Sequence, residues 1–239
     1  MSWTPQKRFW TEVRVSDANG GYCVLLDGRP MRTPAKADLL LPTRTLALAV
    51  AQEWEAQEEA LRPDQMPLTR ASNSAIDKVT PNRASVADMI AEYGSTDMLC
   101  YREPHVQPLS QRQAADWDPW LDWAHRRFDV RLQSAAGVMH IDQPAEAIQR
   151  LTSEVHGYDP FPLTALHDLV TLSGSLILGL AIAEGALDAQ EAWRISRLDE
   201  QWQEDLWGLD DEAQALTESR RMAFTAAAEL LDLLKGTGK

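Results

Sequence analysis

The sequence predicts an α+β protein, with a small N-terminal domain of antiparallel strands plus one helix over residues 1–64 and a larger all-helical bundle domain over residues 65–239. Two observations support this division. In the first forty residues, short apolar runs alternate with Asn-Gly and Asp-Gly pairs, which are typical of hairpin turns. Beyond residue 64 these signals stop, and apolar residues recur three and four positions apart, as they do on one face of a helix.

The N-terminal domain is expected to contain four short strands and one helix. Asn19-Gly20-Gly21 and Asp27-Gly28 separate the first three strands. Thr43 can cap the helix, because its hydroxyl can accept a hydrogen bond from a free backbone N–H of the first turn. An antiparallel sheet with one helix across its face forms a layer pair. The predicted elements are strands at Phe9–Val15, Tyr22–Leu26, Arg29–Thr33 and Leu39–Leu41, and a helix from Arg44 to about Glu59.

The second domain is expected to be a series of helices that begin or end at proline, glycine or capping residues. Pro81 should end the first one, because the residue before a proline is pushed out of the helical region. Ser110 with Gln113 fits a capping box, and Pro119 predicts either one kinked helix or two short ones. The expected elements are helices at Thr69–Val79, Asn82–Tyr93, Ser110–Phe128, Pro144–His156 (closed by Gly157), Asp188–Gly208 and about Asp210–Leu234, with brief extended segments at Val130–Leu132 and Val138–Ile141.

The last two of these helices carry apolar residues at helical spacing, which predicts one buried face on each. On the first, the expected buried residues are Ala192, Ile195, Leu198, Trp202 and Leu206. On the second, they are Ala213, Leu216, Ala223, Ala227, Leu230 and Leu234.

The most apolar stretch of the chain, Pro162–Glu184, is expected to be one helix buried on nearly all sides. Its uncharged part, Leu169–Ala183, has 15 residues and is shorter than the ~20 that a membrane-spanning helix needs. A membrane anchor is therefore the disfavoured alternative, and we expect the protein not to be embedded in a membrane.

The formal net charge of -13 argues against nucleic acid as a partner, because an acidic surface repels phosphate. The charge is uneven, since residues 184–239 hold six Lys/Arg against thirteen Asp/Glu. Cys23 and Cys100 form no disulfide framework, which favours a reducing compartment. The first ten residues contain no secretory signal. These features predict a bacterial cytoplasmic protein, or a mitochondrial matrix protein if the chain is a processed eukaryotic form.

Motifs for catalysis are absent from the sequence: it contains no phosphate-binding loop, no nucleophile elbow and no HExxH. The five histidines lack the spacing of a helical metal pair, so no metal site is expected. His167 and Asp168 are the best candidate acid–base pair in the sequence. However, the side chains of neighbouring residues on a helix point about 100° apart and should not orient each other. A small hydrolase or ligand-binding enzyme that uses this pair, or the carboxylates Asp116, Asp118 and Asp122, is the alternative function.

Tryptophan is unusually frequent, with nine residues against four Phe and four Tyr. Trp117, Trp120 and Trp123 repeat every three residues, while Trp202 and Trp207 lie in the acidic C-terminal third. Trp is enriched among binding hot spots, although most single Trp residues are buried in a core. Some exposed aromatic surface is therefore expected.

Several segments together resemble one family, the assembly chaperones that hold the alpha subunit of F-type ATP synthase before it joins the beta subunit. The matching segments run in order over nearly the whole chain. They are KRFW at Lys7–Trp10, GRPMRTPAK at Gly28–Lys36, Glu53-Trp54, MPLTRASNSAID at Met66–Asp77, STDMLCYR at Ser95–Arg102 and SRLDEQWQEDLWG at Ser196–Gly208.

The resemblance implies a two-domain protein that transiently binds the alpha subunit, with no enzymatic activity and no cofactor. We expect it to be monomeric when free. The segment from Asp199 to Glu212 mixes acidic and aromatic groups, so we expect client binding by Glu200, Trp202, Glu204, Trp207 and Glu212. A solvated helix face is the competing interpretation of this segment.

Four further residues are expected to stabilise the junction between the two predicted domains: Trp54, Arg70, Asn73 and Asp77. Trp54 lies on the apolar stripe of the first helix. Arg70 has a guanidinium group that can bind backbone carbonyls on both sides of the junction.

Overall fold

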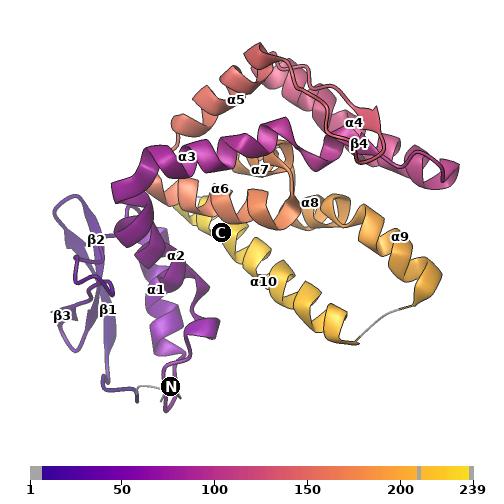
Figure 1. Cartoon of the computed structure of the whole chain (residues 1–239). Coiled ribbons are helices and arrows are strands. Elements are labelled where there is room, and N and C mark those ends of the chain that lie inside the picture. The colour runs from indigo at the N-terminus through magenta and orange to yellow at the C-terminus, as the bar shows by residue number, and fades with distance from the viewer. Residues whose placement is uncertain (1–6, 209–210, 237–239) are drawn as a thin grey trace. The chain divides into compact units, whose positions relative to one another are not determined.

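The computed structural model describes residues 7–208 and 211–236. A small antiparallel sheet near the N-terminus is followed by a mostly helical chain, which confirms the predicted α+β class (Figure 1). Contacts divide the chain into two compact units. Unit 1 combines Met1–Arg83, Pro160–Ala165 and Glu229–Lys239, and unit 2 combines Ala84–Asp159 and Leu166–Ala228. The domain boundary after residue 64 stays a prediction, while the contacts group residues 65–83 with unit 1.

The sheet of unit 1 has three antiparallel strands, β1 (Val13–Ala18), β2 (Gly21–Leu26) and β3 (Arg29–Pro30), in that order. The register of β1 and β2 runs from Val13 opposite Leu26 to Ala18 opposite Gly21. Gly20 makes the tight turn between them possible, because its φ of +90° lies in the region that favours glycine.

Three of the predicted strands differ from those observed. The strand predicted at Arg29–Thr33 is shortened to Arg29–Pro30, and the N–H of Thr33 donates to the nearby Ala37 carbonyl (2.9 Å). β1 begins at Val13 instead of Phe9, because the N–H groups of Thr11 and Glu12 donate to the Asp27 carboxylate (3.0 and 2.9 Å) and not to a neighbouring strand. Leu39–Leu41 forms no fourth strand. Its N–H groups bond in two directions, Leu39 to the Met31 carbonyl and Leu41 to the Tyr22 carbonyl, so no ladder continues.

Helix α1 (Arg44–Glu55) begins as predicted and ends four residues earlier than expected. The hydroxyl of Thr43 accepts a hydrogen bond from the N–H of Leu46 (3.2 Å), which is the cap inferred from the sequence. The buried residues Leu46, Ala47 and Val50 share the apolar stripe, and α1 packs against β1 and β2.

The predicted break at Pro81 is wrong. Helix α2 (Pro67–Ser74) continues through a π-helical turn (Ala75–Val79) and a 3₁₀ turn (Thr80–Asn82) into α3 (Arg83–Ala91). Thr80 remains helical, with φ -53° and ψ -51°. Pro81 is tolerated because it lies in the first turn of the 3₁₀ segment, where a backbone N–H is not needed.

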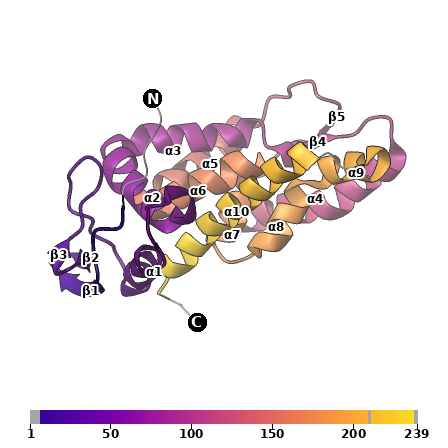
Figure 2. The ribbon, with the colours of Figure 1, turned by 90° about the horizontal axis from the view of Figure 1, so that it is seen from below.

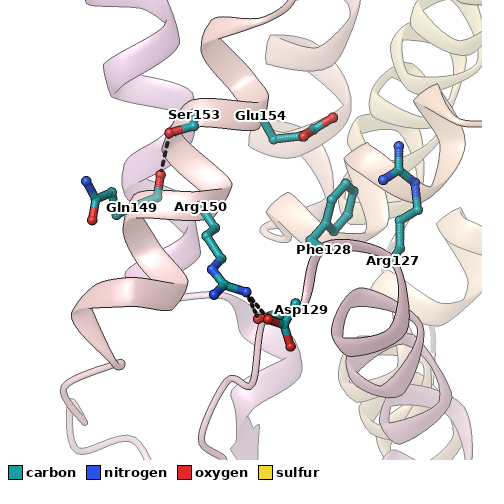
Figure 3. A pocket seen from close by; sticks show the side chains of 7 residues that line it. All are labelled: Arg127, Phe128, Asp129, Gln149, Arg150, Ser153 and Glu154. Carbon is teal, nitrogen blue, oxygen red and sulfur yellow. Dashed lines mark hydrogen bonds and ion pairs between the residues drawn. The ribbon is translucent and has the colours of Figure 1, made fainter.

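Helix α4 (Gln107–Phe128) is continuous through Pro119 and begins three residues before the predicted capping box. It ends at Asp129, whose φ of +55° is left-handed, and Arg150 of α5 (Ala145–His156) bonds this carboxylate (Figure 3). Gly157 closes α5 as predicted. The strand between α4 and α5 is β5 (Ala135–Ala136), which pairs in parallel with β4 (Tyr101–Arg102). No strand forms at the predicted extended segments Val130–Leu132 and Val138–Ile141.

The apolar stretch Pro162–Glu184 forms two helices, not the single one predicted: α6 (Pro160–Ser173) and α7 (Leu176–Ala183). Gly174 ends α6 with a φ of +74°, and the Ser175 hydroxyl accepts from the N–H of Leu178 (3.1 Å) to start α7. All eight residues of α7 are buried. Within the described residues, no helix is long and apolar enough to cross a membrane.

A buried carboxylate closes the break between α6 and α7. Asp97 is fully buried, and it accepts hydrogen bonds from the N–H of Ile177, the hydroxyl of Ser175 and the N–H of Leu99 (3.0 Å each). It therefore satisfies backbone donors at the amino end of α7 that would otherwise be buried without a partner. Burial raises the pKa of Asp97 to about 6, against the opposing effect of these hydrogen bonds.

The segment Asp188–Gly208 also forms two helices in place of the one predicted, α8 (Ala189–Ser196) and α9 (Leu198–Trp207), separated at Arg197 (φ -103°, ψ 14°). Helix α10 (Asp211–Leu234) is the last helix (Figure 2). Its expected start at Asp210 lies outside the described residues. Four residues predicted to be buried are exposed: Leu206, Ala213, Leu216 and Ala223. The buried face of α10 begins only at Phe224 and includes Ala227 and Leu230.

Within unit 1, polar contacts join the residues before position 64 to those after it. Trp54 is half-buried, packs against Trp10 with ring centroids 4.9 Å apart, and donates from Nε1 to the hydroxyl of Thr69 (3.2 Å). Asp77 accepts hydrogen bonds from the Thr33 hydroxyl (2.6 Å) and the backbone N–H of Ala35 (3.1 Å). Both residues therefore connect segments on either side of position 64 within unit 1, and their role at a domain junction stays a prediction.

The other two expected junction residues contribute less. Arg70 is exposed, and within the described residues its guanidinium donates to no backbone carbonyl. Asn73 is half-buried, and its Oδ1 has no hydrogen-bond partner among the described residues.

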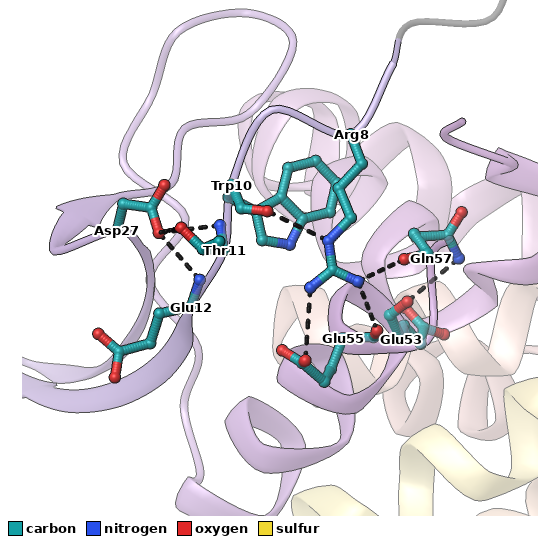
Figure 4. A network of polar contacts seen from close by, with 8 residues as sticks. All are labelled: Arg8, Trp10, Thr11, Glu12, Asp27, Glu53, Glu55 and Gln57. Carbon is teal, nitrogen blue, oxygen red and sulfur yellow. Dashed lines mark hydrogen bonds and ion pairs between the residues drawn. The ribbon is translucent and has the colours of Figure 1, made fainter. Parts of the chain in front are cut away.

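Arg8 and Glu53 form the contacts that the sequence did not reveal (Figure 4). The Arg8 guanidinium donates to the backbone carbonyls of Trp10 (3.2 Å), Glu55 (3.0 Å) and Gln57 (2.5 Å). The half-buried Glu53 carboxylate accepts from the N–H groups of Leu68 (2.6 Å) and Thr69 (2.8 Å), which caps α2. These two residues, not Arg70, connect the start of the chain, α1 and α2.

Replacing Asp97 by Asn should remove a pH dependence of stability. Because the folded-state pKa is raised, the contribution of Asp97 is full below its unfolded pKa of about 4 and is lost as the pH rises through about 6. The free energy of unfolding of wild type minus that of Asp97→Asn should therefore fall by roughly 2 kcal/mol between about pH 4 and pH 7. Urea unfolding at several pH values measures it, and a difference that does not change with pH would contradict the assignment.

Replacing Trp54 by Ala should destabilise unit 1 by about 3 kcal/mol, the low end for truncating a large aromatic residue, because the ring is only half-buried. Trp54→Phe keeps most of the packing against Trp10 and loses the hydrogen bond to Thr69, so it should cost about 1 kcal/mol. Thermal unfolding followed by circular dichroism compares the two variants. Trp54→Ala melting like wild type would show that the residue has no structural role.

Candidate functional site

The acidic helix α9 is anchored at its amino end to α4. Leu198 is buried, and Asp199 accepts a hydrogen bond from Nε2 of Gln113 (2.7 Å). Just before α9, Nε1 of the buried Trp117 donates to the carbonyl of Ile195 (3.1 Å). The base of α9 is therefore fixed by side chains of α4, while its later residues extend away from that contact.

Arg197 organises the charges of this surface. Its guanidinium forms ion pairs with Glu200 (3.0 Å) and Glu204 (3.3 Å), and also donates to the hydroxyl of Thr217 on α10 (3.4 Å). It lies over the ring of Trp193. Glu200 and Glu204, which the sequence suggested as independent contact residues, thus share one cation that also connects α9 to α10.

The remaining expected contact residues differ in exposure. Trp202 is half-buried, whereas Trp207 at the carboxyl end of α9 is 85% exposed. Glu212 is exposed on the first turn of α10. The structure therefore brings Glu200 and Glu204 together through Arg197 and leaves the Trp207 ring open to solvent; residues 209 and 210 lie outside the described residues.

This surface is predominantly acidic. Between Leu198 and Ser219 the sequence holds eight Asp/Glu and no Lys or Arg. Of the nearest cations, Arg197 pairs with the two glutamates of α9, Arg221 pairs with Glu218 (2.6 Å), and Arg220 is exposed. Such a surface attracts basic groups and repels phosphate.

Residues considered for catalysis form contacts that do not assemble a reactive centre. Contrary to the sequence expectation, His167 and Asp168 do orient each other, with Nδ1 and Oδ1 2.9 Å apart, because the two side chains can bend toward each other at the helix surface. Asp116 pairs with Arg194 (2.8 Å) and Asp118 with Arg102 (2.5 Å). Two carboxylates of the Asp116–Asp122 cluster are thus occupied by arginines.

Burial raises the pKa of the Cys100 thiol to about 12, so it supplies no thiolate nucleophile at neutral pH.

An open hollow of about 500 Å³ lies between the end of α4 and α5 (Figure 3). Its cations are already neutralised, Arg150 by Asp129 and Arg127 by Glu184 (2.6 Å). It contains neither the His167–Asp168 pair nor the Asp116–Asp122 carboxylates; its lining residues are Arg127, Phe128, Asp129, Gln149, Arg150, Ser153 and Glu154. The hollow therefore offers no support for the enzyme alternative.

A family model and a curated relative both match this chain to ATP12 proteins. A family model described as the ATP12 chaperone protein matches residues 7–125. "Protein atp12, mitochondrial" of Schizosaccharomyces pombe is 23% identical over 222 residues, which is 88% of this chain and 76% of that protein. The family-model match ends before α8, so the α9–α10 surface lies outside it.

Solved structures resemble the whole chain. The crystal structure of Atp12 from Paracoccus denitrificans is 47% identical, covers 96% of this chain and 98% of its own, and has a TM-score of 0.93; a point mutant of that protein gives the same values. A crystal structure from Agrobacterium tumefaciens is 43% identical over 95% of this chain and 86% of its own, with a TM-score of 0.92. The chain therefore belongs to the ATP12 family of ATP synthase assembly chaperones, which are not enzymes.

Proposed function

We propose that this protein binds the unassembled alpha subunit of F-type ATP synthase, prevents its aggregation and hands it over to the beta subunit. The observation that carries the proposal is the similarity to Atp12 of Paracoccus denitrificans over 96% of the chain. The family accounts for a role in ATP synthase assembly, and the motifs at Met66–Asp77 and Ser196–Gly208 favour the alpha subunit as the client.

The mechanism follows from mass action. An unassembled subunit exposes apolar surface that its neighbour later covers, and such patches drive aggregation. A chaperone that binds this surface lowers the concentration of the free subunit and releases it when a partner binds more tightly. No phosphate-binding motif occurs in the sequence, which is consistent with release by competition.

The acidic and aromatic residues of α9 and the start of α10 are the proposed contact surface: Glu200, Trp202, Glu204, Trp207 and Glu212. The 85% exposure of Trp207 supports this choice, because an exposed Trp that becomes buried on binding is a frequent hot spot. We expect the free protein to be a monomer that acts in the bacterial cytoplasm, or in the mitochondrial matrix if it is a processed eukaryotic form.

Co-expression with the alpha subunit alone tests the function. Soluble alpha subunit that co-purifies with this protein is the expected result, and added beta subunit should then displace it. Aggregation of the alpha subunit to the same extent with and without this protein would refute the proposal.

Charge reversal at Glu200 should weaken capture about five- to tenfold while the melting temperature stays that of wild type, because the side chain is exposed and its ion pair with Arg197 contributes little to stability. Glu191→Lys is the matched control, since Glu191 forms the same i,i+3 pair with Arg194 on α8, away from the proposed surface. The ratio of alpha subunit to chaperone after pull-down measures both. Equal capture by Glu200→Lys and Glu191→Lys would identify α9 as an ordinary solvated face.

A further inference from the structure

Helix α9 carries an apolar stripe that is covered at its base and uncovered toward its end. Leu198, Trp202 and Leu206 are spaced four residues apart and so lie near one another on the helix surface. Leu198 is buried, Trp202 is half-buried and Leu206 is 61% exposed. The protein's own packing thus covers only the first part of this stripe.

Helix α10 also has covered and uncovered apolar residues, but here the uncovered ones come first in the chain. Phe224 is buried and packs against Trp193 with ring centroids 5.3 Å apart. At about 100° per residue, Leu216 lies roughly 80° around the helix from Phe224 and Ala213 only about 20°. Both are exposed, Leu216 by 61%; Ala213 continues the face of Phe224, and Leu216 lies at the edge of that face.

Two side-chain contacts place the two helices together at the base of their stripes. Arg197 bonds the Thr217 hydroxyl (3.4 Å), and Trp193 packs on Phe224. Leu206 lies in the last turn of α9 (Leu198–Trp207), and Leu216 directly precedes Thr217 in the first half of α10 (Asp211–Leu234). Exposed apolar side chains on two helices that contact each other are typical of a surface that another molecule covers.

The surrounding charge indicates what that molecule is like. Eight acidic residues and no Lys or Arg lie between Leu198 and Ser219. A second copy of this chain would bring a second acidic surface to the contact, which like-charge repulsion disfavours. A partner with basic side chains around an apolar segment complements both properties.

We propose that Leu206 and Leu216 seat an apolar segment of the alpha subunit that is flanked by lysine or arginine side chains. The inference rests on the proposed function and adds to it the second helix, α10, and the chemistry of the segment that is recognised. The acidic residues orient the basic flanks, while the two leucines are covered by the apolar segment.

The double variant Leu206→Ser/Leu216→Ser tests the proposal by co-expression with the alpha subunit. We expect at least tenfold less alpha subunit recovered per chaperone than with wild type, because both apolar contacts are lost. Met222→Ser is the matched control. Met222 is 60% exposed, nearly as much as Leu216, but it lies about 160° around α10 from Phe224, on the opposite face. This control should capture the alpha subunit within twofold of wild type.

Circular dichroism and thermal unfolding check that both variants fold, as expected for substitutions at exposed positions. If wild type captures the alpha subunit and the double variant captures it equally well, the seat is wrong and the proposed function stands. If wild type captures none, the proposed function itself fails. A dimer of the free protein that the double variant abolishes and Met222→Ser retains would make a second copy the occupant and overturn the proposal.

An array of overlapping peptides from the alpha subunit tests the chemistry separately. The peptides that wild type retains and the double variant loses should combine apolar residues with at least two Lys or Arg, and their binding should weaken as salt is added. Retention of peptides without basic residues would contradict the recognition proposed here.

Discussion

The buried contact between Asp97 and the amino end of α7 is the constraint on which unit 2 depends. Helix α7 is buried at every position, so a break in the backbone just before it exposes donors in a place that water does not reach. Asp97 and Ser175 satisfy those donors. Helices α4 and α8 pack on α7, and α4 in turn fixes the base of α9 through Trp117 and Gln113. The candidate surface is thus supported by a chain of contacts that begins at a buried carboxylate.

Local signals in the sequence predicted the elements whose ends depend on local chemistry. The Thr43 cap, the turn at Gly20 and the end of α5 at Gly157 each follow from residues within a few positions. The division of Pro162–Glu184 was missed because its cause is not local. Ser173-Gly174-Ser175 was visible as a run of small residues, but the partner that makes a buried break stable, Asp97, lies 78 positions from Ser175. Arg8 was missed for the same reason, since its acceptors Glu55 and Gln57 lie more than 45 positions away.

At the candidate site, periodicity predicted which residues share a face but not how far that face is covered. Leu206 and Leu216 belong to the stripes that the spacing indicated, and only the tertiary structure shows that nothing in the described chain covers them. The role of Arg197 was missed for a different reason. A single arginine in an acidic stretch looks like a surface charge, whereas in the structure it separates α8 from α9 and bonds groups on both α9 and α10.

A chaperone that acts by competition needs a surface apolar enough to hold its client and small enough to release it. Few exposed apolar side chains provide limited contact area, which keeps affinity below that of a subunit interface that buries a much larger surface. Exposed leucine and tryptophan side chains also tend to promote self-association, and the acidic residues around them oppose it. In the proposed mechanism, like charges would keep two copies of this protein apart at the same surface that would attract a basic client. If the surface binds its client as proposed, the net charge of -13, to which residues 184–239 contribute most, is part of how an apolar surface can stay uncovered until the client binds.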